Sequence, residues 1–393
     1  MMTAPTKKIK CLQWNARGLT RSKLEEFRDY LISFSPEVAL ISETHWSSAF
    51  DVRFRAYHVL KKDRHPRQGG GVALLIHKSL QFLQIDCPPS DTVEAIGATV
   101  ITSDFGSVDF FSVYVPKGNC DLEDIQFLFN RDNLFVVAGD FNGHHSLWED
   151  GCTINRSGRA VADALLTNHD ACLITPVDLG TRVNPSSGKA STIDLTLSSS
   201  RLALGTTASL GPFMGSDHLP VLFTLDATPT RSTSRAPAWI LDDSEKWGPW
   251  NSDLSKALND LSFSSISDPV SAFPIFTRKI LISSNRHFRK RNPFPKPKSE
   301  ACRPWWNEEC KNLIKEARVA FRNWRDAPLS TEKRAAWCKA EAKKRKLINQ
   351  ERRISRGLLS GPTSTQSRIY LSSGPSPKPC LAEVARIQQM WRP

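Results

Sequence analysis

Short apolar runs dominate the first 226 residues, and most of them end at a glycine, a serine, a proline or a charged residue. Runs of about four to eight apolar residues with such boundaries predict buried β-strands. The predicted strands are residues 9–14, 38–42, 72–77, 93–102, 108–115, 134–138, 192–197 and 219–225.

Helical spacing is rarer in this region. Apolar residues recur every three or four positions between residues 24 and 34, and Pro36 ends that helix. We also expect helices over residues 122–129 and 157–168, the second with Ser157 as its N-cap. Many strands with a few helices between them favour an α/β sandwich over a doubly wound parallel sheet.

The pattern changes after residue 226. Residues 227–238 are polar and contain proline, which is typical of a linker. Two apolar stripes, over residues 310–324 and 337–354, predict a helical hairpin that turns near Pro328. We predict four segments: a globular domain over 1–226, a Pro-rich basic linker with short helices over 227–304, a basic helical hairpin over 305–358 and a flexible tail over 359–393.

Positive charge is concentrated in the second part of the chain. Residues 1–226 hold 21 Lys and Arg against 25 Asp and Glu, a net charge of −4. Residues 227–393 hold 32 against 15, a net charge of +17, and the two parts together give the total of +13. Such an excess indicates a nucleic acid or another polyanion as a partner, although a solvated helical surface explains any single basic cluster as well.

Two classes of protein are disfavoured. The longest apolar runs are too short to span a membrane, and residues 1–10 have no apolar core of a secretory signal, so we expect no membrane partner. The nine cysteines have no spacing typical of a zinc site and fit reduced thiols in an intracellular protein.

Candidate chemistry lies at the ends of predicted strands. Asp140 and Asn142 follow a buried strand, and side chains two apart on a strand point to the same side, so both could grip one ligand. Glu43 follows another strand, and Asp217 and His218 lie far downstream. Each motif alone is weak evidence for catalysis. Asp-x-Asn, for example, is common in turns and helix caps. Together they supply the groups that metal-assisted phosphodiester hydrolysis needs.

The order of these motifs resembles the endonuclease/exonuclease/phosphatase family, whose members include DNase I. The six matching segments are Gln13-Trp14-Asn15, Ser42-Glu43-Thr44, Val113-Tyr114-Val115-Pro116, Gly139-Asp140-Phe141-Asn142, Thr192-Ile193-Asp194-Leu195 and Ser216-Asp217-His218. A false match usually involves one motif, so six in order identify residues 1–226 as similar to this family. The resemblance implies a four-layer DNase I-like α/β sandwich of two packed mixed sheets flanked by helices, followed here by a basic helical region.

Within that family the chain resembles the endonuclease domains of Jockey-type non-LTR retrotransposons. Residues 143–148, 155–158 and 304–310 carry this likeness. No Tyr-x-Asp-Asp polymerase motif occurs, so we expect an element protein that is truncated before the reverse transcriptase.

The resemblance also implies roles for individual residues. The implied catalytic residues are Asp140, His218, Asp194, Asn142 and Tyr114, and the implied Mg²⁺ ligands, which would also accept Mn²⁺, are Glu43, Asn15 and Asp217. We expect nucleic-acid contacts from Arg17, Lys117, His144, Arg289, Lys290 and Arg291. Arg17 and Lys117 depart from the pattern of the repair enzymes, and both departures add positive charge near the site.

The implied function is a Mg²⁺-dependent DNA endonuclease that nicks target DNA in the nucleus and leaves a 3′-hydroxyl for target-primed reverse transcription. Element RNA is a further candidate partner of the basic tail. Two alternatives stay open at this point. One is a phosphoesterase of the same fold that acts on abasic DNA or a small phosphate ester, and the other is an inactive nucleic-acid-binding remnant.

Overall fold

Two six-stranded mixed sheets form the centre of the protein, whose computed structural model describes residues 8–64, 69–231, 239, 244–259, 269–289 and 305–359. The first sheet has the order β13-β14-β1-β2-β4-β3 and the second the order β5-β6-β7-β8-β12-β9. The strands of the first sheet are β1 (Ile9–Asn15), β2 (Val38–Ser42), β3 (Tyr57–Lys62), β4 (Val72–His77), β13 (Ala208–Leu210) and β14 (Val221–Leu225). Those of the second are β5 (Phe82–Ile85), β6 (Glu94–Thr102), β7 (Gly106–Tyr114), β8 (Leu134–Asp140), β9 (Ala171–Leu173) and β12 (Asp194–Ser199).

Each sheet contains one parallel pair among antiparallel neighbours. The parallel pairs are β1 with β2 and β7 with β8. A small separate hairpin joins β10 (Arg182–Val183) to β11 (Ala190–Ser191).

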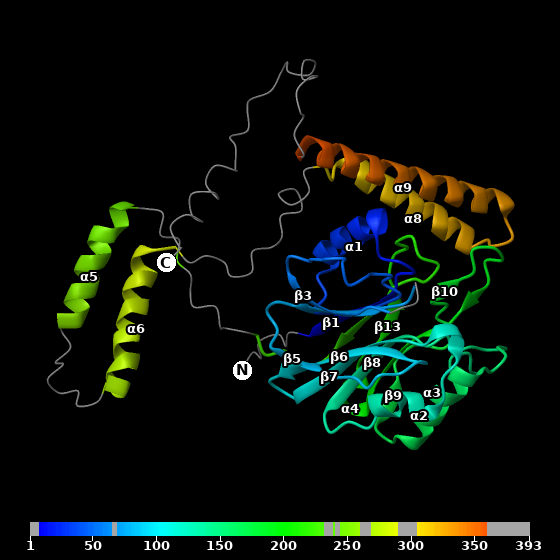
Figure 1. The fold of residues 1–393 in the computed structure, drawn as a ribbon, viewed down its shortest axis with the longest axis horizontal. Helices are drawn as coiled ribbons and strands as arrows, with labels where there is room; N and C mark the ends of the chain where they lie inside the picture. Colours follow the sequence, from blue (N-terminus) through cyan, green and yellow to red (C-terminus); the bar gives the residue numbers. More distant parts are fainter. Residues whose placement is uncertain are drawn as a thin grey trace, which may run out of the picture.

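The sheets face each other across an apolar interior, and helices cover their outer faces (Figure 1). Helix α1 (Arg21–Phe34) packs on the first sheet, and α2 (Leu122–Ile125) and α3 (Arg156–Thr167) pack on the second. The remaining short helices of this region are η1 (Pro116–Gly118), η2 (Gln126–Leu128) and α4 (Ser200–Ala203). The predicted four-layer α/β sandwich is therefore confirmed.

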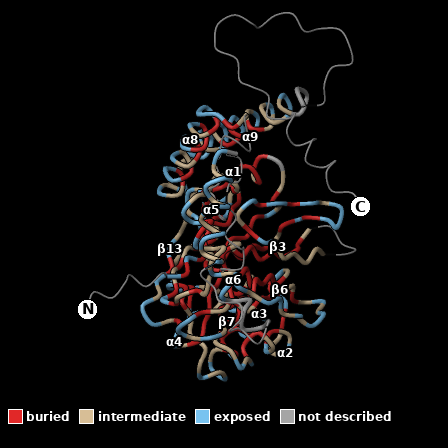
Figure 2. Tube along the Cα trace, turned by 90° about the vertical axis from the view of Figure 1, so that its left-hand side faces the viewer, coloured by how far each residue is buried: buried red, intermediate tan, exposed pale blue. Residues whose placement is uncertain are grey.

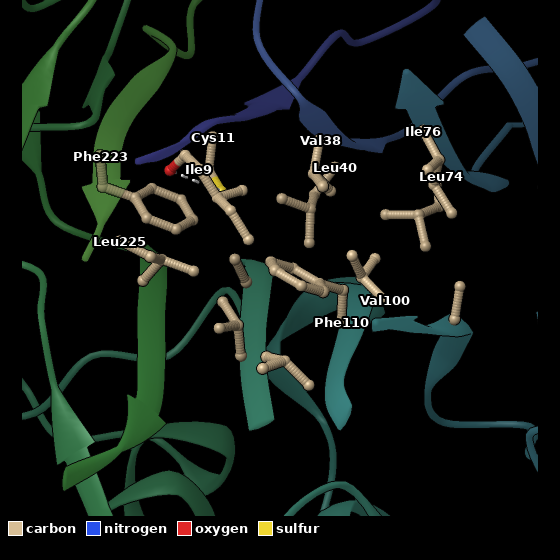
Figure 3. Packing of buried hydrophobic residues seen from close by; sticks show 14 of the residues in the cluster. Ile9, Cys11, Val38, Leu40, Leu74, Ile76, Val100, Phe110, Phe223 and Leu225 are labelled. Atoms are coloured by element: carbon tan, nitrogen blue, oxygen red, sulfur yellow. Dashed lines mark hydrogen bonds between the residues drawn. The ribbon is translucent and has the colours of Figure 1, made fainter. Parts of the chain in front are cut away.

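Three strands inside the sheets, β2, β4 and β8, are buried on both faces along most of their length, and most of their residues are apolar. In β8, Val136 and Ala138 point into the interior between the sheets, while Phe135 and Val137 pack under α3. Figure 3 shows the interior side chains that the two sheets contribute, and Figure 2 shows buried residues through the whole centre of the sandwich. Strands covered on both faces lack polar alternation.

The strands predicted from apolar runs all occur, with ends shifted by a few residues. Sequence reasoning missed β3, β5, β9, β10, β11 and β13, which are short or partly exposed. The helix expected over 122–129 is divided into α2 and η2.

Ser157 does not cap α3, contrary to the prediction. The N-cap is Asn155, whose side-chain oxygen accepts from the backbone N–H of Gly158 at 2.8 Å. Ser157 lies inside the helix, where its hydroxyl donates to the carbonyl of Phe141 at 2.7 Å. That bond ties α3 to the loop that follows β8.

Most of the residues that the structure describes in the second part of the chain are helical. The helices are η3 (Ser244–Lys246), α5 (Trp247–Asn259), α6 (Pro269–His287), α8 (Glu308–Arg325) and α9 (Thr331–Leu359). Helices α8 and α9 form the expected hairpin, and α9 also lies against α1 (Figure 1).

Within the described ranges no helix combines the length and the apolar character that a membrane span needs. Isolated bridges join Thr102 to Pro229 and Leu80 to Arg231. The division of the chain into four segments stays a prediction.

Candidate active site

The two parallel strand pairs bring polar residues together at one edge of the sandwich. Asn15 is the last residue of β1 and lies beside Ser42 of β2, so Glu43 follows immediately. Tyr114 and Asp140 are paired at the ends of β7 and β8 in the same way. Because the sheets face each other, these two ends meet.

Asn15 joins the two ends. Its buried amide nitrogen donates to Glu43 Oε1 at 2.8 Å and to Asp140 Oδ2 at 2.7 Å. Its side-chain oxygen accepts from the backbone N–H of Arg17 at 2.9 Å. Asn15 therefore holds two carboxylates side by side, one from each sheet.

Glu43 is held as an anion. It adopts a left-handed conformation with a φ of 49°, and its Oε2 lies 3.2 Å from His45 Nε2. Burial alone would raise the pKa of Glu43, but the hydrogen bonds from His45 and Asn15, together with the nearby charge of His218, lower it to about 2. The carboxylate is thus ionised throughout the physiological range.

Asp140, Asp194 and His218 form a buried cluster whose nearest side-chain nitrogen and oxygen atoms lie within 4.8 Å of one another. Asp194 is the first residue of β12 and the cross-strand neighbour of Asp140. His218 Nδ1 lies 2.8 Å from Asp194 Oδ2. Asp194 also accepts from Thr181 Oγ1 at 2.7 Å and from Gln13 Nε2 at 3.2 Å, so its orientation is fixed from several directions.

The surroundings of the cluster raise the pKa values of Asp140 and His218. Burial raises the pKa of Asp140 to about 7, and the neighbouring Asp194 charge adds to this rise against the opposing effect of His218. Burial would lower the pKa of His218, but the charge and hydrogen bond of Asp194 outweigh it and raise that pKa to about 9. At neutral pH the imidazole is therefore cationic.

Asn142 and Tyr114 flank Asp140. The backbone N–H of Asn142 donates to Asp140 Oδ1 at 2.8 Å, and its amide group donates to Asp140 Oδ2 at 3.2 Å. Asn142 reaches this position through a left-handed turn with a φ of 46°, and not through strand alternation, because β8 ends at Asp140. The Tyr114 hydroxyl hydrogen-bonds to Glu43, and burial followed by the charges of Glu43 and Asp140 raises the pKa of Tyr114.

Asp217 is paired with two arginines. Its Oδ2 lies 2.8 Å from Arg17 Nη1 and 3.2 Å from Arg182 Nε, while its buried Oδ1 has no hydrogen-bond partner among the described residues. Burial would raise the pKa of Asp217, but the charges of His218, Arg17 and Arg182 lower it. Sequence reasoning missed Arg182, which reaches the site because an isolated bridge pairs it with His218.

The other residues predicted to contact nucleic acid lie outside this cluster. Lys117 is exposed in η1, directly after β7. His144 Nδ1 lies 2.7 Å from Glu149 Oε2, in a neighbouring hollow that Arg182 also lines. Arg289 is exposed after α6. Lys290 and Arg291 fall outside the described residues.

The chain is similar to one protein-family model and to several known proteins. Residues 108–222 match the family model described as Endonuclease-reverse transcriptase. The chain is 31% identical over 230 residues to a probable RNA-directed DNA polymerase from transposon X-element of Drosophila melanogaster, a match that covers 56% of this chain and 24% of that protein. It is 29% identical over 242 residues to the RNA-directed DNA polymerase from mobile element jockey of the same species, covering 60% and 25%. The chain spans about a quarter of the length of these curated relatives.

Solved structures with a similar backbone include two endonucleases. The endonuclease domain of TRAS1, a telomere-specific non-LTR retrotransposon, is 16% identical with a TM-score of 0.46, and the match covers 55% of this chain and 98% of that one. An AP endonuclease from Archaeoglobus fulgidus is 19% identical with a TM-score of 0.38, covering 56% and 99%. The sequence relatives confirm the predicted resemblance to proteins of Jockey-type mobile elements.

Proposed function

We propose that this retrotransposon endonuclease-type domain is a divalent-metal-dependent DNA endonuclease that nicks one strand of a duplex and leaves a 3′-hydroxyl. The observation that carries the proposal is the convergence of Glu43, Asp140 and His218 on one polar cluster, although they lie far apart in the chain. A base, a cationic acid and further carboxylates are what metal-assisted attack of water on a phosphodiester requires.

The donor atoms fit a hard divalent cation. Glu43 is ionised, and Asp217 Oδ1 is a buried oxygen that lacks a partner among the described residues. We assign Mg²⁺ to Glu43 and Asp217 with Asn15 beside them, and we expect Mn²⁺ to replace it. When bound, the cation offsets negative charge on the phosphate and on the leaving oxygen.

Asp140 is the proposed general base. Its pKa of about 7 lies near the working pH, where proton transfer from water is most effective. The hydrogen bonds from Asn15 and Asn142 hold its carboxylate in one orientation. We assign the amide of Asn142 to hold the attacking water or a phosphate oxygen.

His218 and Tyr114 are the proposed donors to the phosphate. Because His218 Nδ1 is engaged by Asp194, its Nε2 is the nitrogen left to face the substrate. The imidazolium then stabilises the charge that develops at phosphorus, and Asp194 keeps it protonated and oriented. The Tyr114 hydroxyl, which now contacts Glu43, would turn to a phosphate oxygen.

We infer that the substrate is duplex DNA, with Arg17, Lys117 and His144 at the rim and Arg289 farther along the chain contacting its backbone. Element RNA is the competing ligand for the basic helices. Cleavage of chromosomal DNA would place the activity in the nucleus.

Supercoiled-plasmid nicking tests the proposal. The purified chain should convert supercoiled DNA to open circles with Mg²⁺ or Mn²⁺ and not with EDTA. Asp140→Ala should reduce the rate on the order of 100-fold or more, because it removes the base. Asp132→Ala is the matched control, since Asp132 is exposed just before the opposite end of β8.

Two further assays complete the test: one identifies the end that cleavage leaves, and the other offers two alternative substrates. A DNA polymerase should extend the nick directly, as it does from a 3′-hydroxyl; a 3′-phosphate would contradict the proposed attack. Parallel assays use an abasic duplex and an inositol phosphate. If the chain cleaved the abasic duplex or the inositol phosphate but left the plasmid uncut, the DNA-nicking proposal would be wrong. The chain would then be a phosphoesterase that acts on the cleaved substrate. Metal-independent retention of DNA without any cleavage would indicate an inactive binding remnant.

A further inference from the structure

A groove of about 510 Å³ lies where α9 runs past the beginning of α1. One wall consists of residues just before and in α1, including Thr20 and Lys23, and the other of α9 residues, including Arg345 and Lys346. Gly215 is also part of its lining. The groove therefore lies between the helical hairpin and the sandwich, and both contribute to its lining.

The hairpin is fixed in place by apolar contacts and by hydrogen bonds. Phe213 stacks on Phe321 of α8 with ring centroids 4.3 Å apart, Trp324 belongs to the same buried cluster, and the partly buried Trp337 packs against it. Arg318 Nε donates to the carbonyl of Phe213 at 3.1 Å. The far wall of the groove thus has a defined position relative to the candidate active site.

A buried ionic contact fixes α9 to α1. Lys344 Nζ lies 2.7 Å from Glu26 Oε2 of α1 and 2.7 Å from Glu341 Oε2 of α9. The side chains of Lys344 and Glu26 are each 2% exposed. Lys344 is therefore a structural residue, and its charge offsets those of Glu26 and Glu341, which both line the groove.

The groove begins at the rim of the active site. Gly215 precedes the site residue Asp217 by two positions, and Asp217 is paired with Arg17. Lys23 Nζ donates to the carbonyls of Ala16 and Arg17 at 2.6 and 3.0 Å. Gly18, the residue after Arg17, lines the groove, and the Arg17 side chain is 56% exposed.

The open part of the groove is basic. Arg345 and Lys346 are exposed, and Glu341, the acidic neighbour of Arg345, is already engaged by Lys344. Lys339 and Arg353 are also exposed and lie seven residues before and after Lys346. Seven residues are close to two helical turns, so these three basic residues follow one side of α9 at intervals of roughly 10 Å.

We propose that the sugar-phosphate backbone flanking the scissile phosphate runs from Arg17 into this groove, where Arg345 and Lys346 contact phosphates without reading sequence. The inference rests on the proposed DNA-nicking function. It makes the α8–α9 hairpin a part of the substrate-binding surface and not only a connector. A regular polyanion fits a basic groove of this kind better than a small acidic ligand does, because the basic row continues past the groove along α9.

The test is a charge-reversal variant, Arg345→Glu/Lys346→Glu, in the full chain. Binding to a fluorescent duplex of roughly 30 base pairs is followed by anisotropy in EDTA, between about 50 and about 200 mM salt. The variant should bind about 10-fold or more weakly, and the slope of log K against log salt should fall in magnitude by about two, because two phosphate contacts are lost. Its nicking should show a raised KM.

The matched control is Lys315→Glu/Lys333→Glu, which changes the charge equally. Both lysines are exposed and line a separate hollow between α8 and α9. This control should bind within about twofold of the parent chain, with nearly the same salt slope. Arg345→Gln/Lys346→Gln should reproduce the loss of slope without placing new acids beside Glu341, and it decides the result if the charge-reversal chain does not fold.

The two proposals fail separately. If the parent nicks DNA but the Arg345 and Lys346 variants keep its affinity and slope, the groove proposal is overturned and the nuclease stands. Equal losses in the control and in the test variant would also overturn it, because the effect would then be one of net charge. If the parent binds DNA through the groove but does not nick it, only the proposed function fails.

Discussion

Lys344 gives the sharpest test of how the helical hairpin is held. Its ammonium group is the cation shared by Glu26 and Glu341, and both the Lys344 and the Glu26 side chains are almost fully buried. Burial would lower the pKa of Lys344, but the charges of these two carboxylates raise it. Lys344→Met keeps most of the side-chain volume and removes the charge, so it leaves two carboxylates without their common partner.

The expected loss of stability depends on the ionic partners that Glu26 and Glu341 keep in the variant. Removing one partner of a buried ion pair costs about 3 to 5 kcal/mol, mainly because the other charge stays buried and unpaired. Glu26 keeps Arg318 at 3.3 Å, and Glu341 keeps Arg345 at 3.6 Å. We therefore expect a loss of about 3 kcal/mol, at the lower end of that range, in the free energy of unfolding of the hairpin.

Urea unfolding at neutral pH, followed by tryptophan fluorescence, measures this loss, because Trp324 and Trp337 stack on each other in the docked hairpin. Lys346→Met is the control, since its side chain is exposed on the same helix. It should change stability by less than about 0.5 kcal/mol. The deficit of Lys344→Met should shrink as pH falls, because burial raises the pKa of Glu341 and protonation removes its charge. A loss below about 1 kcal/mol would refute the reasoning.

Two further predictions concern the active site. The kcat/KM of nicking should rise with pH through about 7, where Asp140 loses its proton, and fall above about 9, where His218 loses its proton. Initial rates measured from about pH 5 to about pH 10 check this profile. A profile that is flat across neutral pH would contradict the assignment of Asp140 as the base. Asn155→Ala should lower stability by about 1 to 2 kcal/mol, because the side chain caps α3 and its amide donates to the carbonyl of Asn142 at 2.7 Å. Thermal melting measures that loss, and nicking should fall with it if the bond positions Asn142; an unchanged melting temperature would speak against the cap.

The apolar pattern predicted the centre of the fold because its strands are covered on both sides. Residues 38–41 of β2 and the first five residues of β4 are all buried, so each appears in the sequence as an uninterrupted apolar run. β3 and β5 are each an edge strand of their sheet and are partly exposed, which mixes polar residues into them. Hydrophobic periodicity cannot separate such strands from loops.

The sequence indicated that several candidate residues follow buried strands, but it did not indicate the contacts that they make. The position of Asp140 follows from the end of a buried strand, while Asn142 reaches it by a left-handed turn that Asp-x-Asn alone does not specify. The pairing of Arg182 with Asp217 joins residues 35 positions apart. β10, which carries Arg182, contains only two residues, so no local pattern marks it.

The basic second part of the chain shows why charge counts cannot assign roles. Its excess of positive charge predicted a polyanion surface, and every lysine contributed equally to that count. In the folded chain Lys344 is buried and holds α9 against α1, whereas Lys346, two residues later, is exposed at the groove. A helix turns by about 100° per residue, so two positions suffice to move a side chain from the interface to solvent. The stability loss expected for Lys344→Met and the affinity loss expected on changing Arg345 and Lys346 should therefore be separable, although the residues are neighbours in sequence.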